Sequence, residues 1–132
     1  MWIYEDEPFT EPASDLAGFV YLITRLSDGR KYIGKKTFWN KVSRPPLKGK
    51  KRRRISYVQS DWSSYYGSSE ELSQSVDELG PEAFSRVILH LCKTRSEMSY
   101  LEAKEQFSRD VLLDPAYFNK WISVKVTSKH LT

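Results

Sequence analysis

The fold is decided by residues 18–36, which read GFVYLITRLSDGRKYIGKK. The first part of this stretch is rich in β-branched and aromatic residues, which are typical of strands. Asp28-Gly29 then supplies the positive-φ residue that a two-residue hairpin loop requires. The stretch therefore predicts a β-hairpin with one tyrosine on each strand, Tyr21 and Tyr32.

The two tyrosines are expected on one face of this hairpin. If Asp28-Gly29 form a symmetric loop, Tyr32 faces Arg25, and the period-two alternation of a strand points Tyr21 to the same face. The two phenols would still be offset along the strands in that register. A longer loop or a bulge is the alternative that brings them together.

The charge distribution outside the tyrosines is one-sided. Twelve Lys or Arg residues and no acid lie between Arg30 and Arg54, whereas the first 17 residues hold five acids and no base. A basic block of this kind is the footprint expected for phosphate backbones, with a solvated loop or a targeting tract as the alternative. The candidate nucleic-acid-binding residues are Lys36, Lys48, Lys50, Lys51, Arg52, Arg53 and Arg54. Five aromatic residues interleave with this block and either stack on bases or, as we expect for most, anchor the loop to the core: Trp39, Tyr57, Trp62, Tyr65 and Tyr66.

Length and composition limit the class of protein. With 132 residues, 39% of them hydrophobic and 29% charged, the chain suits one domain with an ordinary core. We expect an acidic arm over 1–17 and a domain over 18–132 whose basic loop spans 35–60. No segment has the roughly 18 apolar residues of a membrane span, and the acidic start is unlike a secretory signal, which predicts a cytoplasmic protein with no membrane partner.

Metal and thiol chemistry based on cysteine is not indicated. The single cysteine, Cys92, lies in an apolar run and is expected to be a free thiol of the core. Together with His90 and His130 it is too little for a four-ligand zinc site. A zinc finger is therefore excluded.

The remaining elements follow from periodicity and caps. Residues 44–46 interrupt any helix that begins near Thr37, because they include two prolines. Capping boxes predict one helix from about Ser69 to Leu79 and a second from Thr94 to about Leu113. Strands are expected at 55–58, 86–92 and 121–126. The fold class is α/β (α+β), with a small, mainly antiparallel, three-stranded sheet flanked by helices.

The second helix carries a carboxylate in its apolar stripe. Glu105 lies on the same face as the residues spaced three and four positions from it, so it is expected to point toward the core. A buried carboxylate requires a metal, a cation or a hydrogen-bond donor. A structural salt bridge to an arginine is the plain alternative, and Glu102, one turn earlier, is a competing acid. The stripe consists of Met98, Leu101, Glu105, Ser108 and Leu112.

The hairpin tract resembles the signature of the GIY-YIG nuclease superfamily, with Tyr21 on the first strand and residues 32–34, Tyr-Ile-Gly, on the second. Phe19 stands where the family name has glycine, although Gly18 is one residue earlier. The resemblance continues through Glu-Gln-Phe at 105–107 and Tyr-Phe-Asn at 117–119, so it covers residues 18 to 126. It is closest to small phage-type, Seg-like homing endonucleases.

This resemblance implies a set of site residues. Tyr21 is the candidate base or water-orienting group, Tyr32 its hydrogen-bonding partner, Glu105 the ligand of Mg²⁺ or Mn²⁺, and Asn119 an orienting group. The alternatives are core aromatics for the tyrosines and an ordinary turn residue for the asparagine. The family also has an arginine on a helix after the second strand, and no such helix is expected here, so we name Arg44 and Lys35 for its role.

The implied function is hydrolysis of DNA phosphodiesters by a metal-dependent endonuclease, which leaves 5′-phosphate and 3′-hydroxyl ends. Target specificity is then expected from the basic loop, from a homodimer or from a partner protein, in the host cytoplasm if the protein is phage-encoded. One alternative is a nucleic-acid-binding module that keeps the fold without catalysis. Another is a structure-specific repair or recombination nuclease that uses the same residues.

Overall fold

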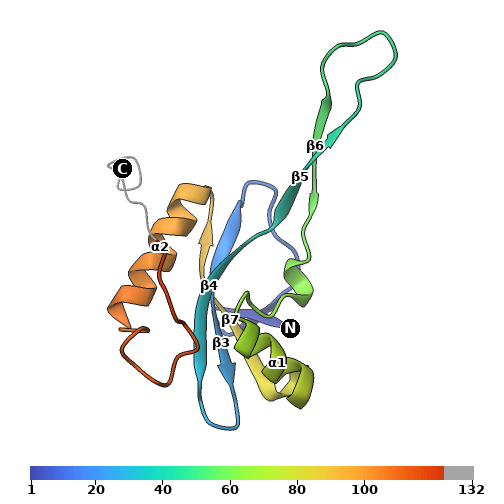
Figure 1. The fold of residues 1–132 in the computed structure, drawn as a ribbon. Helices are drawn as coiled ribbons and strands as arrows, with labels where there is room; N and C mark the ends of the chain where they lie inside the picture. Colours follow the sequence, from blue (N-terminus) through green and yellow to red (C-terminus); the bar gives the residue numbers. More distant parts are fainter. Residues whose placement is uncertain (124–132) are drawn as a thin grey trace.

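The computed structural model describes residues 1–123, and these form a mixed α+β domain with two sheets (Figure 1). Five strands form the main sheet in the order β2-β1-β7-β3-β4, and the other two form a separate antiparallel ribbon. The elements are β1 (Trp2–Tyr4), β2 (Glu7–Phe9), β3 (Gly18–Arg25), β4 (Lys31–Thr37), β5 (Trp39–Arg44), β6 (Arg54–Gln59), the 3₁₀ turn η1 (Trp62–Ser64), α1 (Glu70–Leu79), η2 (Pro81–Ala83), β7 (Phe84–Cys92) and α2 (Arg95–Ser108).

The predicted number of sheet strands was wrong. The antiparallel core of β7, β3 and β4 is present, but β1 adds in parallel to β7 and β2 pairs with β1. Residues 2–9, expected as part of an acidic arm, are therefore strands. Their turn uses Glu5 and Asp6, both at positive φ (50° and 66°), where Asn or Gly is the usual signal. Three of the five acids, Glu5, Asp6 and Glu7, thus lie in the turn and the outer strand, while Trp2 is buried in the core.

The main sheet lies between the two helices (Figure 1). Odd-numbered residues of β3, such as Phe19 and Tyr21, join a core cluster with Leu72 of α1. The even-numbered Val20 packs on the other face with Met98 of α2. This alternation follows from the two-residue period of a strand whose two faces are both covered. Hence β3 reads as a continuous apolar run rather than an alternating one.

The hairpin of β3 and β4 has the longer loop. Arg25 N donates to Arg30 O at 2.7 Å, so residues 26–29 form the loop and the symmetric two-residue loop is wrong. This moves the register by two positions, and Tyr21 pairs with Gly34 while Tyr32 pairs with Ile23. The tyrosines keep the same face, as expected, and their ring centroids are 6.2 Å apart.

Both helices begin at the predicted caps. The Ser69 side chain accepts a hydrogen bond from Leu72 N at the start of α1, and Thr94 Oγ1 accepts one from Glu97 N at the start of α2. Gly80, at φ 86°, ends α1. The second helix stops at Ser108, earlier than expected, because the chain then enters turns.

The region after β4 forms two strands, in keeping with the expectation that no uninterrupted helix follows β4. β5 and β6 pair from Trp39–Gln59 to Arg44–Arg54, and Figure 1 shows this ribbon projecting away from the sheet and helices. Residues 121–123 form no strand, while the remainder of the strand predicted at 121–126, and His130, lie outside the described residues. Neither helix in residues 1–123 has the length and apolar character needed to cross a bilayer.

Candidate active site

A pocket of about 490 Å³ lies beside β4, the edge strand of the main sheet. Four separate parts of the chain contribute to it: β4, the start of α1, the middle of α2 and the segment that follows α2. Such convergence of polar groups from several elements in one hollow is typical of a ligand site. The lining residues are Tyr32, Lys35, Ser68, Ser69, Glu70, Glu71, Glu102, Gln106, Phe118, Asn119, Lys120, Trp121 and Ser123.

The wall of the pocket is held by the backbone of Ile33. Its N–H donates to Asn119 Oδ1 at 3.0 Å, and its carbonyl accepts from Asn119 Nδ2 at 2.8 Å and from Gln106 Nε2 at 3.1 Å. These side chains satisfy polar groups that an edge strand otherwise leaves unpaired. Asn119 thus fixes β4 and, through it, the position of Tyr32 and Lys35.

The two tyrosines lie at different depths. Tyr21 is 1% exposed, does not line the pocket, and covers Gly34 so closely that a Cβ there would collide with its phenol. Burial raises the Tyr21 pKa well above its ordinary value, and the nearby Tyr65 and Tyr32 add to this. Tyr32 reaches the pocket, where its hydroxyl lies 2.8 Å from Ser68 Oγ. Burial raises the pKa of Tyr32 as well.

Glu102 is the carboxylate that α2 presents to the pocket. Its side chain is 13% exposed, and the nearest cation, Lys35 Nζ, is 3.9 Å away. Burial raises the Glu102 pKa, and Lys35 only partly opposes that shift. Lys35 Nζ also donates to Ser99 Oγ at 2.8 Å. The carboxylate is therefore largely buried, and its ion pair with Lys35 is long.

Gln106 extends this acidic corner by one helical turn. It is buried, it lines the same pocket, and its Oε1 has no hydrogen-bond partner within residues 1–123. Its Nε2 is engaged by the Ile33 carbonyl, which fixes the orientation of the amide. A buried acceptor without a donor is costly, so this oxygen suits a bound water or cation.

Glu105 lies outside the pocket. Its carboxylate accepts from Arg109 Nε at 2.9 Å, and its other oxygen is 2.9 Å from His90 Nε2. Burial alone would raise the Glu105 pKa, but the hydrogen bonds from His90 and Arg109 outweigh it and lower the pKa. Glu105 therefore forms a salt bridge with an arginine, which was the predicted alternative to a metal site. It does not line the pocket that Tyr32 reaches, and its role as a metal ligand stays a prediction.

The sequence contained a signal for Glu102 in the spacing of α2. Met98, Glu102 and Gln106 are four residues apart, and this row faces the sheet and the pocket. The predicted apolar stripe that contains Glu105 lies on a neighbouring face of the helix. Its last two members, Ser108 and Leu112, are exposed. Two polar residues in the buried row made that row look less apolar than its neighbour.

The predicted basic residues divide between the pocket and the ribbon. Lys35 lines the pocket, whereas Lys36 lies 4.2 Å above the ring of Tyr65 and pairs with Asp61 at 2.7 Å. Arg44 is on β5, opposite Arg54, and does not line the pocket. The others lie in the loop of the ribbon and at the start of β6: Lys48, Lys50, Lys51, Arg52, Arg53 and Arg54.

Of the interleaved aromatics, most pack against the body as expected. Trp62 is buried, and Trp39, Tyr65 and Tyr66 pack against the same core cluster. Tyr57, on β6, is 65% exposed. Cys92 is a free, buried thiol, and burial raises its pKa to about 12.

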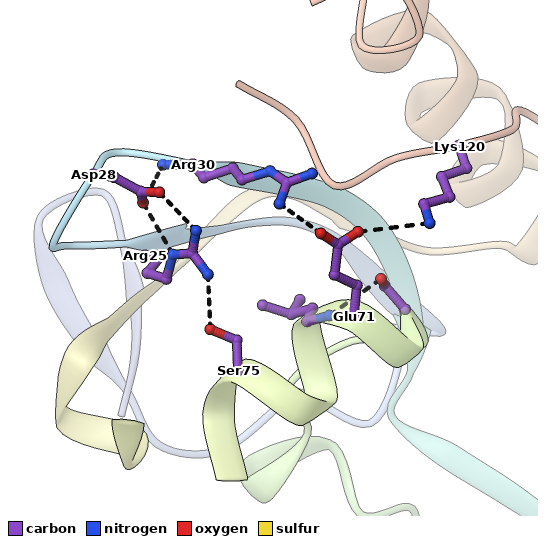
Figure 2. A network of polar contacts seen from close by, with 8 residues as sticks. Arg25, Asp28, Arg30, Glu71, Ser75 and Lys120 are labelled. Carbon is purple, nitrogen blue, oxygen red and sulfur yellow. Dashed lines mark hydrogen bonds and ion pairs between the residues drawn. The ribbon is translucent and has the colours of Figure 1, made fainter. Parts of the chain in front are cut away.

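A network of ion pairs fixes one side of the pocket (Figure 2). Glu71 of α1 accepts from Arg30 Nη1 at 2.6 Å and lies 3.6 Å from Lys120 Nζ. Arg25 pairs with Asp28 at 2.6 Å and donates to Ser75 Oγ at 2.9 Å. The hairpin loop, α1 and the segment after α2 are thus tied together, and Figure 2 shows Glu71 between its two cations.

The donor set of the pocket suits a hard cation that keeps most of its water. No group of three or more His, Cys, Asp or Glu residues gathers anywhere in residues 1–123. Glu102 and the free Gln106 oxygen are one carboxylate and one amide oxygen. Mg²⁺ commonly takes one or two carboxylates and completes its shell with waters and substrate oxygens.

Comparison with known proteins identifies the family. A family model described as "Putative endonuclease segE, GIY-YIG domain" matches residues 2–122. No curated protein and no solved structure matches the chain significantly. The family match includes the sheet, both helices, the ribbon and the segment that carries Asn119. The chain therefore belongs to the segE-type family of GIY-YIG endonuclease domains.

Proposed function

We propose that this domain hydrolyses phosphodiester bonds of DNA in the pocket beside β4, with a divalent cation, Mg²⁺ or Mn²⁺, held by Glu102. The observation that supports this best is the shared location of three groups: Glu102, Tyr32 and Lys35 line one pocket. Membership of an endonuclease family supports the reaction class. The choice of Glu102 over Glu105 is based on burial, partners and position.

Glu102 and Gln106 are the residues that would hold the cation. Glu105 is unsuited because both of its oxygens already have partners, His90 and Arg109. When bound, such a cation polarises the phosphoryl oxygen and stabilises the leaving oxygen. The Gln106 amide is fixed by Ile33 and leaves its oxygen available for the cation or for a water bound to it.

Tyr32 and Lys35 act on the phosphate and the attacking water. Tyr32 contacts Ser68 at 2.8 Å and lies in the pocket, so its hydroxyl is placed to orient a water. Lys35 provides the positive charge that offsets the phosphate and the charge that develops on it. This assigns to Lys35 the role for which Lys35 and Arg44 were both named, and it leaves Arg44 to contact DNA elsewhere.

Tyr21 packs against Tyr32 on the buried side of the pocket wall. It is buried, with its pKa raised well above the ordinary value by that burial, so it is a poor proton acceptor at neutral pH. Its ring lies next to Tyr32 and covers Gly34. We therefore assign it a positioning role. The expectation that Tyr21 acts as the base stays a prediction, and Tyr32 is the better-placed group.

The test compares Glu102→Gln with Glu105→Gln on supercoiled plasmid in Mg²⁺ or Mn²⁺, with EDTA as a metal-free control. Glu102→Gln should reduce the rate of nicking by roughly two to three orders of magnitude, as expected for loss of a group that acts in the transition state. Glu105→Gln is the matched control on the same helix and should cut at a rate close to that of the unaltered protein.

Two results would overturn this assignment. Loss of cutting in Glu105→Gln alone would return the metal site to Glu105. Uncut plasmid in every divalent metal, together with binding that weakens steeply with salt, would favour the non-catalytic binding module instead.

A further inference from the structure

We propose that the β5–β6 ribbon inserts into the major groove of double-stranded DNA and is the duplex-recognition element of this protein. The proposal rests on the proposed function only in taking DNA as the polyanion. It goes further by assigning one element, one groove and one face of the ribbon to recognition.

The dimensions of the ribbon suit that groove. Each strand has six residues, Trp39–Arg44 and Arg54–Gln59, so the paired part is about 20 Å long at roughly 3.3 Å per residue. Two antiparallel strands lie about 5 Å apart, and with their side chains they fill a groove about 12 Å wide. The ribbon projects from the body of the domain, so it can enter a groove while the body contacts the neighbouring backbone (Figure 1).

The positive charge of the ribbon is not neutralised by acids of its own, so the ribbon is suited to bind an external anion. Arg44 lies directly opposite Arg54, and like charges at paired positions destabilise a sheet. No acid is present from Gly29 to Ser60 to compensate. An isolated two-stranded hairpin is at best marginally stable in water. Repulsion between Arg44 and Arg54 therefore destabilises the distal part of the ribbon. A bound polyanion would relieve that repulsion.

Two arginines are oriented by the ribbon itself. Arg53 donates from Nε to Ser43 Oγ at 2.8 Å and from Nη2 to Ser43 O at 3.3 Å. Arg54 donates from Nε to Pro45 O at 3.2 Å. These bonds connect the two sides of the ribbon where its paired part ends, and they hold the guanidinium groups in fixed directions. Fixed guanidinium groups suit the paired acceptors of phosphates and of guanine.

One face of the ribbon is directed away from the body. Trp39 and Tyr57, on one face, line a small hollow with Ser14 and Arg95. Side chains alternate along a strand, so the opposite face belongs to the other pairs. We assign this opposite face to the base edges. It carries Asn40, Val42 and Arg44 from β5 with Arg54, Ser56 and Val58 from β6.

The root of the ribbon is fixed separately from its tip. Ser60 Oγ donates to Thr37 O at 2.6 Å, and Ser60 N donates to Phe38 O at 2.8 Å. Phe38 is buried in the core. The distal part can therefore be removed above Val42 and Ser56, which are directly opposite each other, by joining them with a two-residue Asn-Gly turn in place of residues 43–55.

The experiment measures DNA binding without cleavage, using Glu102→Gln protein in EDTA and a duplex of about 30 base pairs. Replacing residues 43–55 removes seven cations, so the slope of log affinity against log salt should fall by roughly 3 to 6 at about 0.9 per phosphate. The unshortened protein should protect guanine N7, in the major groove, from methylation by dimethyl sulfate. The shortened protein should lose that protection.

Two further variants separate the ribbon from charge in general. Arg44→Gln combined with Arg54→Gln keeps the ribbon and should lower the slope by about 2. Lys93→Gln combined with Lys104→Gln removes the same charge from the body and should leave the N7 protection in place. A thermal melt of the shortened protein that matches the parent shows that the body has kept its fold.

Three results would overturn the proposal. They are an unchanged slope in the shortened protein, equal affinity for single-stranded DNA, and no N7 protection by the unshortened protein. Because binding is measured with an inactive variant, these results do not depend on catalysis. A protein that cuts DNA with or without its ribbon, and at the same salt slope, would keep the proposed function and lose this inference. Duplex binding through the ribbon without any cutting would keep this inference and contradict the proposed function.

Discussion

At the scale of single residues, two glutamates one turn apart on α2 have opposite environments. Glu102 is largely buried, its ion pair with Lys35 is long at 3.9 Å, and burial raises its pKa. Glu105 has hydrogen bonds from His90 and Arg109 that lower its pKa despite partial burial. The same side chain therefore opposes folding at one position and favours it at the other.

The pH dependence of stability should separate these two residues. A carboxyl with a raised pKa binds more protons in the folded state, so its contribution to stability falls as pH rises above the unfolded value, about 4.3. Glu102→Gln should therefore be more stable than the parent at pH 7, with the difference vanishing below about pH 4. Urea unfolding at a series of pH values measures this.

Glu105→Gln should show the opposite sign in the same measurement. A carboxyl with a lowered pKa stabilises the fold above its unfolded pKa, and that contribution is lost as pH falls through the folded pKa. We expect this variant to lose about 1–2 kcal/mol at pH 7 and little in acid. Equal effects of the two substitutions at pH 7 would contradict the assigned environments.

The sequence pattern led to Glu105 on α2, whereas the carboxylate of this helix that lines the pocket is Glu102. A stripe of residues spaced three and four apart led to Glu105, because Leu101 and Met98 made its face look apolar. The row that lines the pocket contains Glu102 and Gln106, and polar side chains such as these are ordinarily expected on the solvent-exposed face of a helix. Functional residues are often the ones that break the local pattern, since a site requires polar groups where packing alone would place apolar ones.

At the scale of elements, β4 is an edge strand whose free side is covered by side chains. Asn119 bonds both the N–H and the carbonyl of Ile33. The following segment adds Lys31 N to Ala116 O and Phe118 N to Lys31 O, both at 2.7 Å. The pocket wall thus depends on a strand-like contact made by an irregular segment.

Asn119→Leu tests this coverage of the edge strand. The substitution keeps the branched shape of the side chain, with bulkier methyl groups, and leaves the Ile33 N–H buried without an acceptor, which should cost about 1–3 kcal/mol. The rate of plasmid nicking should fall as well, because a shift of β4 at Ile33 would also move Tyr32 and Lys35, which lie on the same strand. Asn40→Leu, on the exposed ribbon, is the matched control and should leave the midpoint of urea unfolding unchanged. A similar midpoint in both variants would show that Asn119 does not hold the strand.

Elements with strong end signals were predictable, and those without them were not. Ser69, Thr94 and Gly80 marked helix ends by hydrogen-bonding chemistry that is local in sequence. The loop of the β3–β4 hairpin was misjudged because Asp28-Gly29 fits a two-residue turn, whereas Arg25 and its ion pair with Asp28 favour the longer one. Pairing between β1 and β7 joins residues more than 80 positions apart, and no local pattern encodes it.

At the scale of the whole molecule, the N-terminal strand completes the core. Trp2 lies 4.9 Å from the ring of Phe19 and 5.4 Å from that of Tyr21. Its Nε1 donates to Trp62 O at 2.8 Å, and the Arg86 guanidinium lies 4.7 Å above its ring. One side chain thus links β1, β3, β7 and η1 beneath the tyrosines.

Trp2→Ala should destabilise the entire domain. Removal of a large buried aromatic typically costs about 3–5 kcal/mol, and here the Trp62 carbonyl also loses its donor. Trp121→Ala is the matched control, because Trp121 is 71% exposed, and its effect should stay within about 0.5 kcal/mol. Urea unfolding followed by far-UV circular dichroism gives both values. A small effect of Trp2→Ala would mean that β1 is dispensable to the core.

The way the ribbon joins the body has a consequence for how this protein can change. The chain leaves β4, forms β5 and β6, and returns to Ser60, which closes on Thr37 and Phe38. The two ends of the excursion are therefore neighbours, and the pocket residues all lie outside it. If the pocket and the ribbon have the roles proposed above, the excursion is a replaceable unit: another sequence between the same two ends would give the domain a different target and leave the pocket unchanged.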